Sequence, residues 1–146
     1  MRRLAPLVPT LAVIALLAAG CGSATNDYRG KVADVQQRYE QQMTELTTRA
    51  TTDIATNPTA ASLTFTELAA VISQFAEDVA VIKPPTGKQQ LASQLVGAYR
   101  TLAQASLDLK AALANSDQAA VQRAIGEFNR ATAQERAAVD AFNAAD

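Results

Sequence analysis

Residues with reactive side chains are few in this chain, and their spacing limits the chemistry they could perform. The chain has no histidine and one cysteine, so a Ser-His-Asp triad and a Cys-His pair are both excluded. Ser106 and Lys110 lie one helical turn apart and could form a lysine-activated serine nucleophile, but this spacing also arises by chance on exposed helix faces. Glu77 and Asp78 are adjacent, so on a helix they point about 100° apart and cannot converge on one bond. The sequence therefore predicts no catalytic residues and a protein that is not an enzyme.

One carboxylate falls on the apolar stripe of the last predicted helix. If Glu135 is buried, it needs a partner, because an unpaired carboxylate inside a protein is costly and tends to take up a proton. Tyr99 or Arg100 on the preceding helix could supply that partner. We favour the alternative in which the stripe is slightly rotated, Ala131 and Ala138 make the contact, and Glu135 stays at the rim of the core.

The three tyrosines of the chain could line a ligand site between helices. Helical bundles sometimes hold small molecules in their cores, and aromatic side chains commonly line such sites. Tyrosine at helical spacing is more often part of the core, with its hydroxyl group at the edge. The candidate ligand or partner contacts are therefore Tyr28, Tyr39, Tyr99 and Glu135.

Composition excludes several classes of function. Bundles that bind haem or paired metals use histidine-bearing motifs, none of which can be built here, so no metal or cofactor is expected. The six glycines are scattered and form no phosphate-binding loop. Without Arg2 and Arg3 the chain carries 11 basic and 14 acidic residues, a poor match to the basic face of a nucleic-acid-binding protein.

Four amphipathic stretches, separated by three turns, predict an all-α protein. The first helix is expected over Asp27–Ala55. The second helix is expected to begin at Thr64, where "TFTE" has the spacing of a capping box, although Asn57 followed by Pro58 is an alternative start. Its apolar residues repeat at intervals of three and four and form one seam: Phe65, Leu68, Ile72, Phe75, Val79 and Ile82.

The third and fourth helices follow the turns "KPPTGK" and "ANSDQ". Two prolines end the second helix because they cannot continue its hydrogen bonds. Thr86 is expected to cap the third helix, and Ser116 or Asn115 the fourth. Short turns make neighbouring helices antiparallel, so we expect a single domain over residues 27–146 that folds as an up-down four-helix bundle.

The first 20 residues have the order of an export signal. Two arginines precede an apolar run, and small residues follow before Cys21. A membrane-spanning anchor is less favoured, because the 17 residues from Leu4 to Gly20 contain two prolines, whereas a spanning helix needs about 20 apolar residues. We therefore expect residues 1–20 to be a cleaved signal peptide.

The sequence "LAAGC" at the end of this signal resembles the lipobox of bacterial lipoproteins. The resemblance implies that Cys21 is acylated on sulfur and becomes the first residue of the mature chain. Ala18 stands where the lipobox most often has leucine, while Ala19 and Gly20 fit it well. Two or more acyl chains give stable membrane attachment, and residues 21–26 would form a short tether from the membrane to the bundle.

The whole chain also resembles the many small, mostly uncharacterised bacterial lipoproteins in which a lipobox precedes a helical domain with a Pro-Pro break, here Pro84 and Pro85. This resemblance implies a protein on the extracytoplasmic face of the cell membrane, at the outer surface or in the periplasm. The expected function is a non-catalytic interaction or accessory role in the cell envelope, with another envelope protein as partner. The alternative is a binding module that holds a small apolar or lipid-like ligand between its helices.

Overall fold

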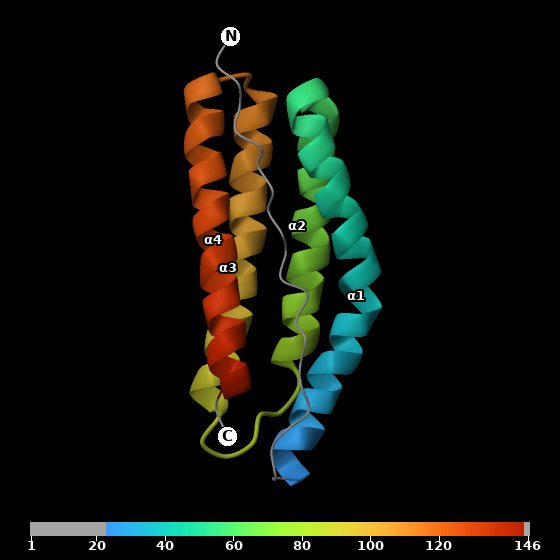
Figure 1. The fold of residues 1–146 in the computed structure, drawn as a ribbon, viewed down its shortest axis with the longest axis vertical. Helices are drawn as coiled ribbons and strands as arrows, with labels where there is room; N and C mark the ends of the chain where they lie inside the picture. The colour runs from blue at the N-terminus through green and yellow to red at the C-terminus, as the bar shows by residue number, and fades with distance from the viewer. Residues whose placement is uncertain (1–22, 145–146) are drawn as a thin grey trace.

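The structure is a computed structural model that describes residues 23–144, and these residues fold into four helices. α1 spans Ser23–Thr56, α2 Pro58–Ala80, α3 Gln89–Ala114 and α4 Gln118–Ala144. The helices lie side by side and successive helices run antiparallel (Figure 1). No strand occurs between residues 23 and 144. The predicted all-α, up-down four-helix bundle is confirmed.

The four helices do not form a closed ring, because α1 and α4 are not packed along their lengths. α1 packs on α2, α2 on α3, and α3 on α4, whereas no Cα atom of α1 lies within 8 Å of a Cα atom of α4. Side chains join these two helices where α1 begins and α4 ends. There the ring centroids of Tyr28 and Phe142 lie 5.6 Å apart. The Arg29 guanidinium donates to the carbonyls of Phe142 and Asn143 at 3.4 and 3.1 Å, groups that an α-helix leaves unpaired at its C-terminus.

α2 begins six residues before the predicted capping box. The side chain of Asn57 accepts a hydrogen bond from the backbone N–H of Ala60 at 3.1 Å, and Pro58 occupies the first helical position. This is the alternative start, and the favoured start at Thr64 is wrong: the Thr64 hydroxyl donates to the Ala60 carbonyl inside the helix. The Asn57 cap satisfies one of the free N–H groups of the first turn. Proline is tolerated at the first helical position, because an N–H group there would have no partner within the helix.

Three other predicted boundaries also need correction. Residues 23–26 belong to α1, so these four residues do not form the predicted tether. Lys88 rather than Thr86 precedes α3, and no side chain caps that helix. At α4 the cap is Asp117, whose carboxylate accepts from the N–H groups of Ala119 and Ala120, rather than the predicted Ser116 or Asn115. Ser116 has a positive φ of 54°, which is not the geometry of an N-cap.

The core runs the length of the bundle and draws on all four helices. The seam predicted on α2 is confirmed over Phe65–Val79, where each of its apolar residues is buried. Ile82 lies beyond the end of α2 and is half-buried. The largest apolar side chains that are less than 2% exposed are Phe75, Phe128, Leu68, Ile72, Leu95, Leu102 and Leu109.

Candidate functional site

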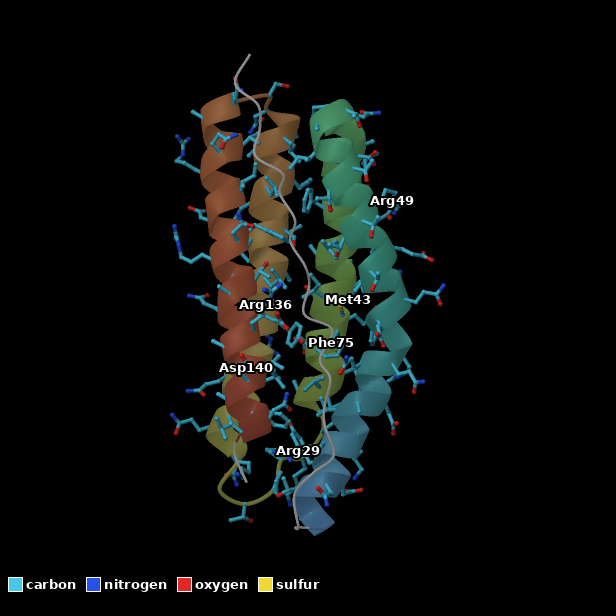
Figure 2. The ribbon with its side chains drawn as sticks, in the orientation of Figure 1. Arg29, Met43, Arg49, Phe75, Arg136 and Asp140 are labelled. Atoms are coloured by element: carbon cyan, nitrogen blue, oxygen red, sulfur yellow. The ribbon has the colours of Figure 1, made fainter. Side chains whose placement is uncertain are left out.

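One layer of side chains crosses the bundle and contains three of the predicted site residues. Tyr39 of α1 meets Phe75 of α2 edge to face, with ring centroids 6.0 Å apart. Phe75 in turn meets Tyr99 of α3 at 4.6 Å. The Tyr99 hydroxyl donates to Oε1 of Glu135 on α4 at 2.9 Å. Each helix contributes one side chain to this set, which we call the cross-bundle layer (Tyr39, Phe75, Tyr99 and Glu135); Phe75 is labelled in Figure 2.

Glu135 is fully buried, so the favoured prediction that it lies at the rim is wrong. Its side chain is 0% exposed, and Ala131, one turn earlier, is buried beside it on the same stripe. Ala138 is half-buried. Tyr99 is the partner that burial requires, while the other candidate, Arg100, pairs with Glu77 at 2.8 Å.

The carboxylate of Glu135 has only one hydrogen-bonded oxygen. Oε1 accepts from Tyr99, whereas Oε2 is buried without a hydrogen-bond partner. Burial raises the pKa of Glu135; the Tyr99 hydrogen bond and the positive charge of Arg136 oppose this rise, and the negative charge of Asp140 adds to it. Burial also raises the pKa of Tyr99 well above its ordinary value, so the tyrosine stays protonated and acts as the donor.

The other edge of the layer carries charge near solvent. The hydroxyl of half-buried Tyr39 donates to Oδ2 of Asp78 at 2.8 Å, and this hydrogen bond raises the pKa of Tyr39. The guanidinium of Arg38 lies 3.5 Å from the same carboxylate oxygen and 5.9 Å from the centroid of the Tyr39 ring. α1 is thereby attached to α2 through a polar cluster at the end of the layer.

Tyr28 lies apart from this layer, at the end of the bundle where α1 begins. It is buried against Phe142 and lines a pocket of about 370 Å³. Its wall combines apolar and small side chains from the end of α2, the loop that follows it and the start of α3 with the polar side chains of Gln89, Ser93 and Arg100, and polar and apolar atoms contribute to it about equally. The volume lies within the range of small-molecule sites, about 300–1,000 Å³. We call this space the end pocket (Tyr28, Val79, Ala80, Ile82, Pro84, Gln89, Ala92, Ser93, Val96, Gly97 and Arg100).

A second hollow, of about 450 Å³, runs along the outside of α3 and α4. Its floor contains the buried alanines Ala105 and Ala131. Its walls carry both signs of charge: Arg100, Asp108, Glu127 and Arg130. The small floor residues let the polar side chains of two helices face one another across an open groove.

The residues considered for catalysis have structural partners. Ser106 is 0% exposed, and its hydroxyl donates to the Leu102 carbonyl at 2.9 Å, so it faces the core rather than a substrate. Glu77 and Asp78 are engaged by Arg100 and by Tyr39, as described above. Between residues 23 and 144 no group of three or more metal-ligating side chains comes together. Cys21 lies outside the described residues.

Two residues that organise these regions were not identified as site residues from the sequence. The spacing of Phe75 predicts its place in the α2 seam but does not indicate that its ring lies between those of Tyr39 and Tyr99. Arg29 is only 4% exposed although it is charged. Its position beside Tyr28 on the buried face of α1 was the available signal, but the carbonyls that it binds are more than 110 residues away.

Comparison with models of protein families, with curated proteins and with solved structures finds no match for this chain. Among the helices between residues 23 and 144, none combines the length and the hydrophobicity required to cross a bilayer.

Proposed function

We propose that the protein is a lipoprotein of the cell envelope, anchored by acyl chains on Cys21, whose helical bundle acts by binding another envelope protein rather than by catalysis. The observation that carries this proposal is "LAAGC" after a charged, apolar export signal. Since α1 begins at Ser23, only Gly22 separates the first helical residue from the anchor. The bundle would therefore lie directly at the membrane surface.

A non-catalytic role is supported by how the bundle uses its reactive side chains. Glu135 and Ser106 are buried and hydrogen-bonded within the fold, and Glu77 pairs with Arg100. General acid–base and nucleophilic catalysis both require a group that reaches the substrate. These side chains instead stabilise contacts between or within helices.

Replacing the anchor residue tests the proposal directly. Cys21→Ser is expected to abolish membrane attachment or to leave the signal uncleaved, because serine has no thiol to acylate. Fractionation and the denatured mass of the protein from its own cells are the measurements: the wild-type chain should lack residues 1–20 and carry acyl chains. Ser23→Ala, two residues away, is the matched control and should remain processed and bound. A Cys21→Ser protein that is correctly cleaved and still in the membrane would refute the anchor.

Native mass measurement of the wild-type protein, extracted in mild detergent, tests the binding role. An added mass of protein size supports a protein partner. A bare, monomeric bundle under conditions that preserve other membrane complexes would count against this role.

The end pocket supports a second candidate function, the binding of a small apolar ligand. Gly97 lines this pocket, and a Cβ atom added there meets nothing within 4 Å. The first side-chain atom of Gly97→Leu therefore has room, and we expect the rest of the leucine to occupy the pocket. Replacing a glycine inside a helix also favours folding. A ligand would add a few hundred daltons to the native mass of the wild-type protein, and Gly97→Leu should remove this increment. The same increment in Gly97→Leu would exclude the pocket.

A further inference from the structure

Three segments meet at the end of the bundle where α1 begins. They are the first turn of α1, the loop of residues 81–88 between α2 and α3, and the last turn of α4 (Figure 1). We call this end the proximal end, because it lies near the proposed anchor. Ser23 is the second residue after Cys21, and two residues of extended chain span at most about 7 Å. The turns at Asn57 and at residues 115–117 lie at the opposite, distal end (Figure 1).

The loop at the proximal end presents an apolar side chain to solvent. Val81 is 83% exposed, the largest value among the exposed large hydrophobic residues of the described chain, the others being Leu63 at 65% and Leu107 at 38%. Its position is held by the end of α2, because its backbone N–H donates to the Glu77 carbonyl. The exposure of Val81 is thus a feature of an ordered helix end rather than of a frayed one.

Hydrogen bonds within the loop fix its shape. The N–H of Ile82 donates to the carbonyl of Val79, and the N–H of Lys88 to that of Pro85. Two prolines restrict the backbone further, and Gly87 supplies the left-handed conformation of the turn with a φ of 83°. The loop therefore presents its side chains in a defined arrangement.

Charge on this loop has one sign. Lys83 is exposed and Lys88 is half-buried, and no acidic residue occurs between Asp78 and Asp108. The nearest carboxylate at the start of α1, that of Asp27, is paired with Lys31 at 2.8 Å. An exposed apolar residue near an exposed lysine, here Lys83, suits an anionic lipid surface: the apolar side chain enters the interface and the cation meets the headgroup phosphates.

We propose that the loop of residues 81–88 docks on the anionic surface of the membrane, with Val81 in the interface and Lys83 against the lipid phosphates. The proposal rests on the proposed anchor at Cys21, which brings the proximal end to the bilayer. Docking would hold the bundle upright, with its proximal end on the lipid and the distal end directed away from the membrane.

A fluorophore that senses its environment can test this orientation. The acylated protein is purified from membranes and placed in vesicles of phosphatidylcholine with phosphatidylglycerol. Val81→Cys carries the label, and Leu63→Cys, also exposed but at the distal end, is the matched control. We expect the label at position 81 to shift to the blue and to be quenched by lipid-attached quenchers, and the label at position 63 to remain in water. A label at position 81 as exposed to water as that at position 63 would overturn the proposal.

The contribution of charge is tested in the same system. Lys83→Gln should lower the ratio of docked to undocked protein about fivefold, the usual effect of one lysine near an anionic surface. Arg123→Gln, an exposed cation near the distal end, should leave the ratio unchanged. Equal effects of the two variants would contradict a docked loop.

Treating the wild-type chain, whose one cysteine is Cys21, with the same label distinguishes failure of the docking proposal from failure of the anchor. An acylated Cys21 has no free thiol and takes up no label. If Cys21 does take up label, the proposed anchor is wrong and the docking proposal falls with it. If Cys21 is blocked but the label at position 81 stays in water, the anchor stands and only the docking proposal fails.

Discussion

Phe75→Ala is expected to lower the free energy of unfolding by about 3–5 kcal/mol, the range for removing a buried phenylalanine. Phe75 is 1% exposed and its ring touches those of Tyr39 and Tyr99. The substitution removes apolar contacts and leaves a cavity between helices whose backbones cannot fully close around it. It also interrupts the cross-bundle layer at its centre. Denaturant unfolding followed by helical circular dichroism gives the measurement.

An exposed apolar residue on the same helix provides the control. Leu63 is 65% exposed, so Leu63→Ala should change the free energy of unfolding by no more than about 0.5 kcal/mol. If the two alanine variants unfold at the same denaturant concentration, Phe75 does not have the central place in the core that the structure gives it.

The fold could be predicted because it depends on periodicity. Apolar residues three and four apart identify one face of a helix whatever that face contacts, so the seam from Phe65 to Val79 was found without knowing its partners. Short turns then left antiparallel packing as the simple solution. The start of α2 was harder, because Asn57 and Thr64 both have good capping chemistry and only the surrounding structure selects between them.

The candidate site was less predictable because it depends on the rotation of each helix. A shift of one residue turns a helix by about 100°, which is enough to move Glu135 between the rim and the core. Ala131 and Glu135 are both buried, so the stripe is not rotated away from Glu135, and contact by Ala131 does not leave the carboxylate at the rim. Tyr99 could be named as a partner, but its contact with Phe75, and through it with Tyr39, joins three helices in a way that no local pattern encodes.

Tyr99→Phe is expected to lower the free energy of unfolding by about 1–3 kcal/mol at neutral pH, the usual cost of leaving a buried polar group unsatisfied. The ring can keep its contact with Phe75, so the change isolates the hydroxyl group. Glu135 then loses the only hydrogen bond that its carboxylate receives, since Oε2 already has no partner. Thermal or denaturant unfolding of the two proteins side by side provides the measurement.

The loss of unfolding free energy caused by Tyr99→Phe should depend on pH, and the titration of Glu135 determines whether it grows or shrinks as the pH rises. Because burial raises the folded-state pKa of Glu135, the protonated group favours folding: its contribution is fully present below the unfolded pKa, about 4.3, and is lost as the pH rises through the folded pKa. The Tyr99 hydrogen bond lowers this pKa, so Tyr99→Phe raises it further. The stability gap between wild type and Tyr99→Phe should therefore widen from about pH 4 to neutral pH.

Glu135→Gln gives the matched background, because the amide keeps an oxygen for Tyr99 but does not titrate. In this background the cost of Tyr99→Phe should be independent of pH over the same range. A gap that is constant with pH in the wild-type background would show that Glu135 does not respond to the Tyr99 hydroxyl.

The double variant Tyr99→Phe/Glu135→Leu shows what the pair contributes to the bundle. Replacing both partners of a buried polar pair by apolar groups is often neutral or stabilising, whereas removing one is costly. We therefore expect the free energy of unfolding of the double variant to be at least as high as that of Tyr99→Phe alone. If it matches the wild type, the pair adds little net stability, and its role is to fix the rotation of α4 against α3, since only one rotation brings Glu135 to the Tyr99 hydroxyl.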